Sequence, residues 1–184
     1  MKPDFWINMA FFQLAWPACV VGAAYGMIWP SVALVGLFAA WQLHPRNAHP
    51  NDRWLVLVFI ATGLILDSVW IQNDVLQYNA AWPSEATTPL WLLMLWVALA
   101  LSVNHSMRYF RQHWLRWSIL LCFASPFSYW MAARLGAVEW LAPDWVVVLL
   151  LGPGWAIVVG ALFALAKRMA GSNEAGRPAF YQKD

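Results

Sequence analysis

The chain has 184 residues, of which 62% are hydrophobic and only 11% are charged. A soluble domain carries about a quarter charged residues, so the composition excludes a water-soluble globule and favours a protein that meets lipid. The net charge of +2 gives no basic face of a size that would bind nucleic acid, and the length allows one compact bundle without a separate soluble domain.

Six apolar segments approach the length of about 20 residues that a helix needs to cross a bilayer. They are residues 5–25, 28–43, 54–72, 89–109, 117–135 and 145–166. The sequence therefore predicts an all-α fold, an integral membrane bundle of six transmembrane helices. Residues 1–168 form this domain, and residues 169–184 form a polar cytoplasmic tail. Because further apolar segments follow the first, we interpret it as a transmembrane helix and not as a cleaved signal.

Caps and breakers refine two of these segments. Thr88 followed by Pro89 predicts an N-cap with proline in the first turn of the fourth helix. Asp144 predicts a cap for the sixth helix. Gly152-Pro153-Gly154 predicts a break a third of the way along that helix, since proline removes a backbone donor.

The basic residues indicate an orientation. Ten of the eleven Lys and Arg residues fall in segments that the six-helix layout puts on one side of the membrane. These ten are Lys2, Arg46, Arg53, Arg108, Arg111, Arg116, Lys167, Arg168, Arg177 and Lys183. Basic residues near transmembrane ends stay in the cytoplasm, so both termini are predicted to be cytoplasmic. Arg134 is the one exception.

Asp67 and Arg134 are the charged residues predicted to lie deepest on the opposite side. Asp67 lies about 20 Å along the third predicted helix from Trp54, and Arg134 lies about 25 Å along the fifth from Trp117. Ionisable groups inside a membrane pair with one another or mark functional sites. We therefore predict an ion pair between Asp67 and Arg134, which either locks the packing or contributes to a binding site.

A second polar group, Ser102, Asn104, His105 and Ser106, falls in the cytoplasmic third of the fourth predicted helix. His105 is the one histidine within a predicted transmembrane segment. Histidine is the usual general base near neutral pH, so His105 is a candidate catalytic residue, with Asp67 as a second. The alternative is that His105 is a hydrogen-bonded structural group, and Asn104 is a candidate binding residue beside it.

Further binding candidates are Gln13, Ser128 and Tyr129. Gln13 lies midway along the first predicted helix, where its amide either bonds a neighbouring helix or faces a polar cavity. Ser128 and Tyr129 follow Pro126 in the fifth, where they either satisfy freed backbone groups or contact a substrate headgroup.

Metal and cofactor motifs are absent from the sequence. There is no pair of histidine boxes of the di-iron kind, no GxSxG elbow and no phosphate-binding loop. We therefore predict no metal site and no cofactor.

Six short motifs occur together in chain order. They are Phe12-Gln13-x-x-Trp16-x-x-Cys19-Val20-x-Gly22-Ala23, Leu66-Asp67-Ser68, Pro89-Leu90-Trp91-Leu92, Asn104-His105-Ser106, Pro126-x-Ser128-Tyr129 and Arg134-Leu135-Gly136-Ala137. As a set they resemble the bacterial inner-membrane family catalogued as domain of unknown function 2878, over residues 6–166. The resemblance implies a multi-pass protein of the inner membrane. It also implies membrane lipids and lipid-modifying enzymes as partners, because members are often encoded near such enzymes.

These observations leave three functions open. The first is an accessory factor in membrane lipid modification or envelope maintenance that binds a lipid or partner through the Asp67/Arg134 and Asn104/His105 groups. The second is an intramembrane lipid-modifying enzyme with His105 as acid and base. The third is a small proton-coupled transporter in which Asp67 carries the proton.

Overall fold

The computed structural model describes residues 3–175, with side chains described as far as residue 171. These residues form seven helices and one two-stranded antiparallel sheet. In chain order the elements are α1 (Pro3–Ala24), α2 (Trp29–Gln42), α3 (Asp52–Gln72), β1 (Leu76–Tyr78), α4 (Leu90–Val103), α5 (Arg108–Gln112), α6 (Trp114–Arg134), β2 (Val138–Trp140) and α7 (Asp144–Ala175). The regular structure of the described residues is therefore helical apart from two strands of three residues each.

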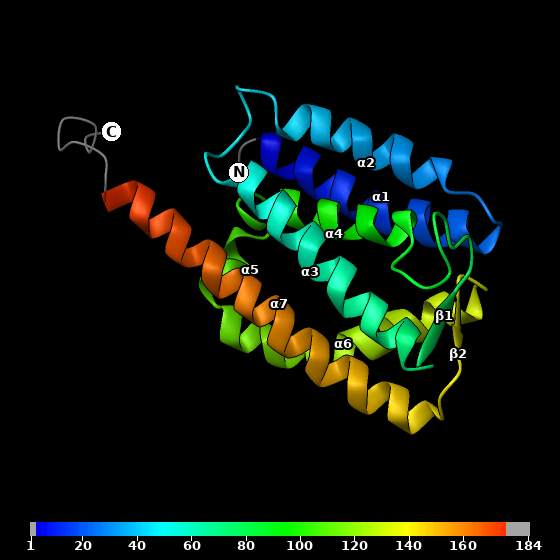
Figure 1. Cartoon of the computed structure of the whole chain (residues 1–184). Coiled ribbons are helices and arrows are strands. Elements are labelled where there is room, and N and C mark those ends of the chain that lie inside the picture. The colour runs from blue at the N-terminus through cyan, green and yellow to red at the C-terminus, as the bar shows by residue number, and fades with distance from the viewer. Residues whose placement is uncertain (1–2, 176–184) are drawn as a thin grey trace.

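The six long helices run in alternating directions, so that the bundle has two chemically different ends (Figure 1). α1 begins and α7 ends at one of them, and β1 and β2 lie at the other. We call the first the basic end, because the segments gathered there carry Arg46, Arg53, Arg108, Arg111, Arg116, Lys167 and Arg168. The other is the sheet end. The charge asymmetry of the sequence thus corresponds to the two ends of the folded bundle.

α4 lies at the centre of the bundle, packed against α1, α2 and α3. Its large side chains Trp91 and Trp96 are each only 1% exposed, and Trp96 stacks on Trp155 of α7 at 4.7 Å. A helix that is apolar on all sides belongs in an interior, which explains this position.

Three helices, α1, α3 and α7, are long and apolar enough to cross a membrane. α2 and α4 have 14 residues each. A helix of that size is about 21 Å long, which is shorter than the hydrocarbon core of about 30 Å. α4 also ends earlier than the sequence predicts, at Val103 instead of residue 109. Residues 104–107 form a turn, because their short polar side chains bond to other elements and compete with the helical backbone.

The predicted cap of α4 is wrong as well. α4 begins after Pro89 without a side-chain cap bond. The Thr88 hydroxyl instead lies 3.0 Å from the carbonyl of Leu64 and 3.1 Å from the hydroxyl of Ser68. Thr88 therefore ties the segment before α4 to α3.

The predicted break in α7 is wrong, because the helix is continuous from Asp144 to Ala175 with Pro153 inside it. The predicted tail is helical as far as Ala175, and its remaining residues lie outside the described part of the chain. Gly152 lets α7 pack closely against α6, because a Cβ atom there would lie 2.5 Å from the carbonyl oxygen of Cys122 on α6. Small residues let membrane helices approach in this way.

Replacing Gly152 with alanine should therefore push α6 and α7 apart and lower the free energy of unfolding by about 1–3 kcal/mol, the usual cost of overpacking. Gly36 in α2 is the matched control, since a Cβ there meets nothing within 4 Å. Gly36→Ala should leave stability unchanged or raise it by up to about 1 kcal/mol. Thermal unfolding in detergent measures both variants, and equal midpoints would contradict the expectation.

Candidate functional site

A cavity of about 430 Å³ lies between α1, α4, α6 and α7. This volume falls within the range of about 300–1,000 Å³ that is typical of small-molecule sites. Most of the lining is apolar and comes from Phe12, Trp16, Leu92, Leu95, Leu99, Met107, Phe110, Trp117, Leu120, Leu121, Ala124, Trp155, Val159 and Phe163. The cavity is therefore suited to an apolar ligand.

The cavity exists because the bundle packs as two units at this point. α1 packs chiefly against α2 and α4, whereas α6 packs chiefly against α7. A hydrogen bond of 3.0 Å from the indole Nε1 of Trp16 to the hydroxyl of Ser128 bridges α1 and α6 across the gap. Two bulky rings, Trp155 and Phe163 of α7, also contribute to its wall.

Four polar side chains line the same cavity: Gln13, Ser125, Ser128 and Tyr129. Three of them form hydrogen bonds with other groups of the protein. Ser125 donates to the carbonyl of Leu121 at 2.8 Å, Ser128 accepts from Trp16, and Tyr129 donates to a carboxylate. The amide of Gln13 makes no hydrogen bond to any residue that the structure describes. It is therefore the polar group of this cavity that remains free for a ligand.

The cavity reaches the outer surface of the bundle between α1 and α6. Gln13, Leu120 and Ala124 line the cavity and are also exposed. Their exposed neighbours are apolar, with Leu14 54% and Phe123 73% exposed. The cavity therefore opens on an apolar part of the outer surface.

Asp67 lies behind the cavity wall and is fully buried. One carboxylate oxygen accepts hydrogen bonds from the hydroxyls of Tyr129 at 2.8 Å and Tyr78 at 3.2 Å, and the other accepts from Nε1 of Trp96 at 2.8 Å. Three elements besides α3 thus supply its partners. Tyr129 joins this carboxylate to the cavity, because the same side chain lines the cavity wall.

The predicted ion pair between Asp67 and Arg134 is wrong. Arg134 lies exposed in the last turn of α6, and its guanidinium stacks over the ring of Trp130 at 5.2 Å. Asp67 meets α6 at Tyr129, five residues before Arg134, and Arg134 lies on the exposed side of the helix. Three uncharged donors satisfy the carboxylate of Asp67 in its place.

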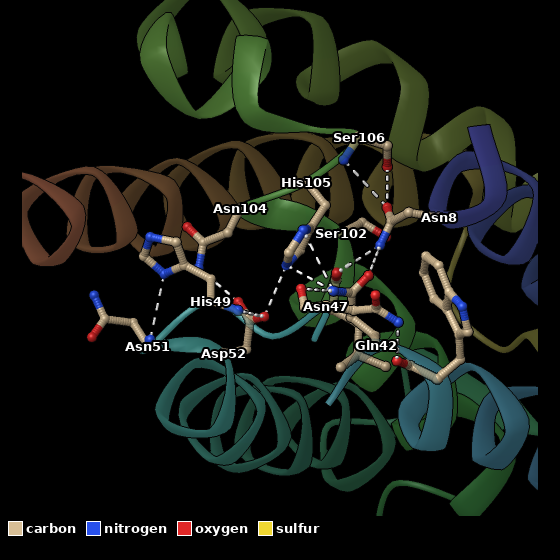
Figure 2. Close-up of polar contacts among 12 residues, drawn as sticks. Asn8, Gln42, Asn47, His49, Asn51, Asp52, Ser102, Asn104, His105 and Ser106 are labelled. Atoms are coloured by element: carbon tan, nitrogen blue, oxygen red, sulfur yellow. Dashed lines mark hydrogen bonds and ion pairs between the residues drawn. The ribbon is translucent and has the colours of Figure 1, made fainter. Parts of the chain in front are cut away.

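A separate polar cluster occupies the basic end and centres on Asp52, which is fully buried (Figure 2). One oxygen of Asp52 lies 2.8 Å from Nε2 of His105 and accepts the backbone N–H of His49 at 2.8 Å. The other oxygen accepts from the amide of Asn104 at 2.8 Å. The Asn104 oxygen in turn accepts from the guanidinium of Arg111. Burial lowers the pKa of His49 below its usual value, against the opposite effect of Asp52.

Asn8 and Gln42 extend this cluster to α1 and α2 (Figure 2). The amide of Asn8 donates to Gln42 at 2.6 Å and to the carbonyl of Leu101 at 3.0 Å, and its oxygen accepts from the hydroxyl of Ser106. Nε2 of Gln42 lies 3.0 Å from Nε2 of His105. The cluster therefore links the ends of α1, α2, α3 and α4.

The structure sorts the predicted site residues into three places. Gln13, Ser128 and Tyr129 share the cavity; Asn104 and His105 lie in the basic-end cluster; Asp67 touches the cavity only through Tyr129. Arg134 belongs to none of these, and His105 does not line the cavity.

Sequence reasoning missed five members of the basic-end cluster: Asn8, Gln42, His49, Asp52 and Arg111. The available signal was Asp52, an acidic residue in an otherwise basic connection. A partly exposed histidine and a buried aspartate at 2.8 Å form the kind of pair that can move a proton. Among the residues that the structure describes, no three His, Cys, Asp or Glu side chains lie close enough together to hold a metal ion.

Comparisons with known proteins give one match. No curated protein and no solved structure matches the chain. The family model described as protein of unknown function (DUF2878) matches residues 5–161, a span that contains every residue of the cavity except Phe163. The chain therefore belongs to the DUF2878 family of proteins of unknown function.

Proposed function

We propose that this protein crosses the bacterial inner membrane six times and holds a membrane lipid in the cavity between α1, α4, α6 and α7. In this proposal it is an accessory factor in membrane lipid modification or envelope maintenance, working beside lipid-modifying enzymes. The observation that carries the proposal is the apolar cavity of about 430 Å³ with its mouth on an apolar outer surface.

The alternating directions of the six long helices support six passes. α2 and α4 are short for a full span, but α4 is packed inside the bundle, where it meets protein and not lipid. The gathering of basic residues at one end supports a cytoplasmic location for that end, where α1 begins and α7 ends. The inner-membrane location is part of the same proposal.

Filling the cavity tests the binding of lipid. Ala124→Trp puts an indole at the mouth, where Ala124 is both exposed and part of the lining. The indole would keep two or three methylenes of the lipid's acyl chain out of the cavity, at about 0.8 kcal/mol each, and should weaken binding at least about tenfold. Native mass spectrometry of the purified protein titrated with phosphatidylglycerol measures this binding.

Phe123→Trp is the matched control, because Phe123 is the preceding residue of α6 and is 73% exposed outside the cavity. It introduces the same side chain and should leave binding unchanged. Equal binding by the two variants and the unaltered protein would contradict the proposal. In cells, a strain without the gene should show an altered lipid profile that the Phe123→Trp gene restores and the Ala124→Trp gene does not.

The pair of Asp52 and His105 favours a second candidate, a lipid-modifying enzyme that uses His105 as acid and base. The cavity argues for the accessory function, since His105 is not part of its lining. The same strains separate the two. His105→Gln, in a protein that still binds lipid, should restore the lipid profile if the function is accessory and should fail to restore it if His105 is catalytic.

A further inference from the structure

The two ends of the cavity differ in chemistry. Toward the basic end it is lined by Met107, Phe110 and Trp117, and farther along α6 by Ser128 and Tyr129. The distance along α6 between Trp117 and Tyr129 is about 18 Å. The cavity is therefore elongated along the helix axes, as a lipid chain would be, and one of its ends lies where the bundle carries its positive charge.

Two arginines flank that end. Arg108 directly follows Met107, and Arg116 directly precedes Trp117, so each backbone lies within about 3.8 Å of a residue that lines the cavity. Both side chains are exposed. Within the described part of the chain, neither forms an ion pair with an aspartate or glutamate.

The neighbouring charges of this region do not neutralise these two. Arg111 is buried and donates to Asn104. Lys167 on α7, which packs against α5, is exposed and donates to the carbonyl of Gln112 at 3.2 Å. Within the described part of the chain, the charges of Arg108 and Arg116 near this end of the cavity are thus not balanced by an ion pair.

We infer that the lipid is an anionic glycerophospholipid, with one acyl chain in the cavity and its phosphate against Arg108 and Arg116. This inference rests on the proposed function and adds the class of lipid. Arginine binds phosphate by charge-assisted, two-point hydrogen bonds, and basic residues at the membrane surface attract anionic headgroups. A lipid without net negative charge would fill the apolar part equally well and leave the positive charge of the two guanidinium groups unbalanced.

The test titrates the full-length protein in detergent with phosphatidylglycerol and phosphatidylcholine of identical chains, and with the free fatty acid of that chain, by native mass spectrometry. We expect phosphatidylglycerol to bind about tenfold more tightly than phosphatidylcholine, because the choline cation of phosphatidylcholine offsets the charge of its phosphate and is repelled by the two arginines. The R108Q/R116Q double variant should lose this preference, chiefly through weaker binding of phosphatidylglycerol. The R46Q/R53Q variant removes two other exposed arginines of the basic end and should keep the preference.

Equal binding of the two phospholipids by the unaltered protein, or a preference that survives R108Q/R116Q, would overturn the inference. So would a fatty acid that competes as well as phosphatidylglycerol. In these cases the proposed function stands as long as Ala124→Trp still weakens the binding of phosphatidylcholine. If neither phospholipid binds, the proposed function fails, and the inference fails with it.

Discussion

Replacing Asp67 with alanine is expected to lower the free energy of unfolding by about 2–5 kcal/mol, through three lost hydrogen bonds, two of them between helices and one from β1. The carboxylate is fully buried and accepts from Tyr78, Trp96 and Tyr129. Alanine would remove the carboxylate acceptor from three buried donors. Since β1, α4 and α6 each supply one donor to α3, the loss should loosen the contacts of the whole sheet end of the bundle.

Two further variants make this expectation specific. Ile65→Ala removes a side chain larger than that of aspartate from the same helix, but Ile65 is 67% exposed. The midpoint of thermal unfolding of this variant should therefore stay close to that of the unaltered protein. Tyr78→Phe removes one donor and leaves the carboxylate with two, so it should cost about 1 kcal/mol. Thermal unfolding followed by tryptophan fluorescence measures all three. If Asp67→Ala and Ile65→Ala unfold at the same temperature, the carboxylate does not hold these elements together.

The positions of the six long helices could be predicted because each is a continuous apolar segment, and a membrane gives such segments a characteristic length. The end of α4 and the continuity of α7 at Gly152 could not be predicted. At Asn104 the competition between helix and side-chain bonds is decided by Asp52, which is distant in the sequence. At Gly152 the helix continues because α6 packs against it at close range, and the sequence does not show that contact.

The site was predictable to a similar degree. Gln13, Ser128 and Tyr129 could be found because polar residues in apolar helices are costly unless they have partners or a ligand. Their meeting in one cavity depends on how α1 and α6 are rotated. The false pair of Asp67 and Arg134 has the same origin, since depth can be estimated from residue number but helix rotation cannot. Tyrosine and tryptophan donors replace the expected arginine because they reach the buried face.

Replacing Asp52 with alanine is the second change for which we expect a large effect, a loss of about 2–4 kcal/mol of unfolding free energy. Its two oxygens contact Asn104, His105 and the backbone N–H of His49. His105 in turn contacts Gln42 of α2, and Asn104 accepts from Arg111 of α5. Without the carboxylate, these donors lose their shared acceptor. The positive charge of Arg111 also loses the nearest negative group of the cluster.

Asp144 provides the control, because both aspartates lie in the first turn of a long helix. Each interacts with the helix dipole by about 0.3–1 kcal/mol, but Asp144 is exposed and its side chain bonds to no other element that the structure describes, so Asp144→Ala should cost only that amount. The difference in unfolding free energy between the two variants then measures how much the basic-end cluster contributes to stability. Asp52→Ala should also separate α3 from the turn at 104–107, which hydrogen exchange of that turn would detect. Equal stability of the two variants would mean that the basic-end cluster does not hold the helices, and His105 would then need a role other than structure.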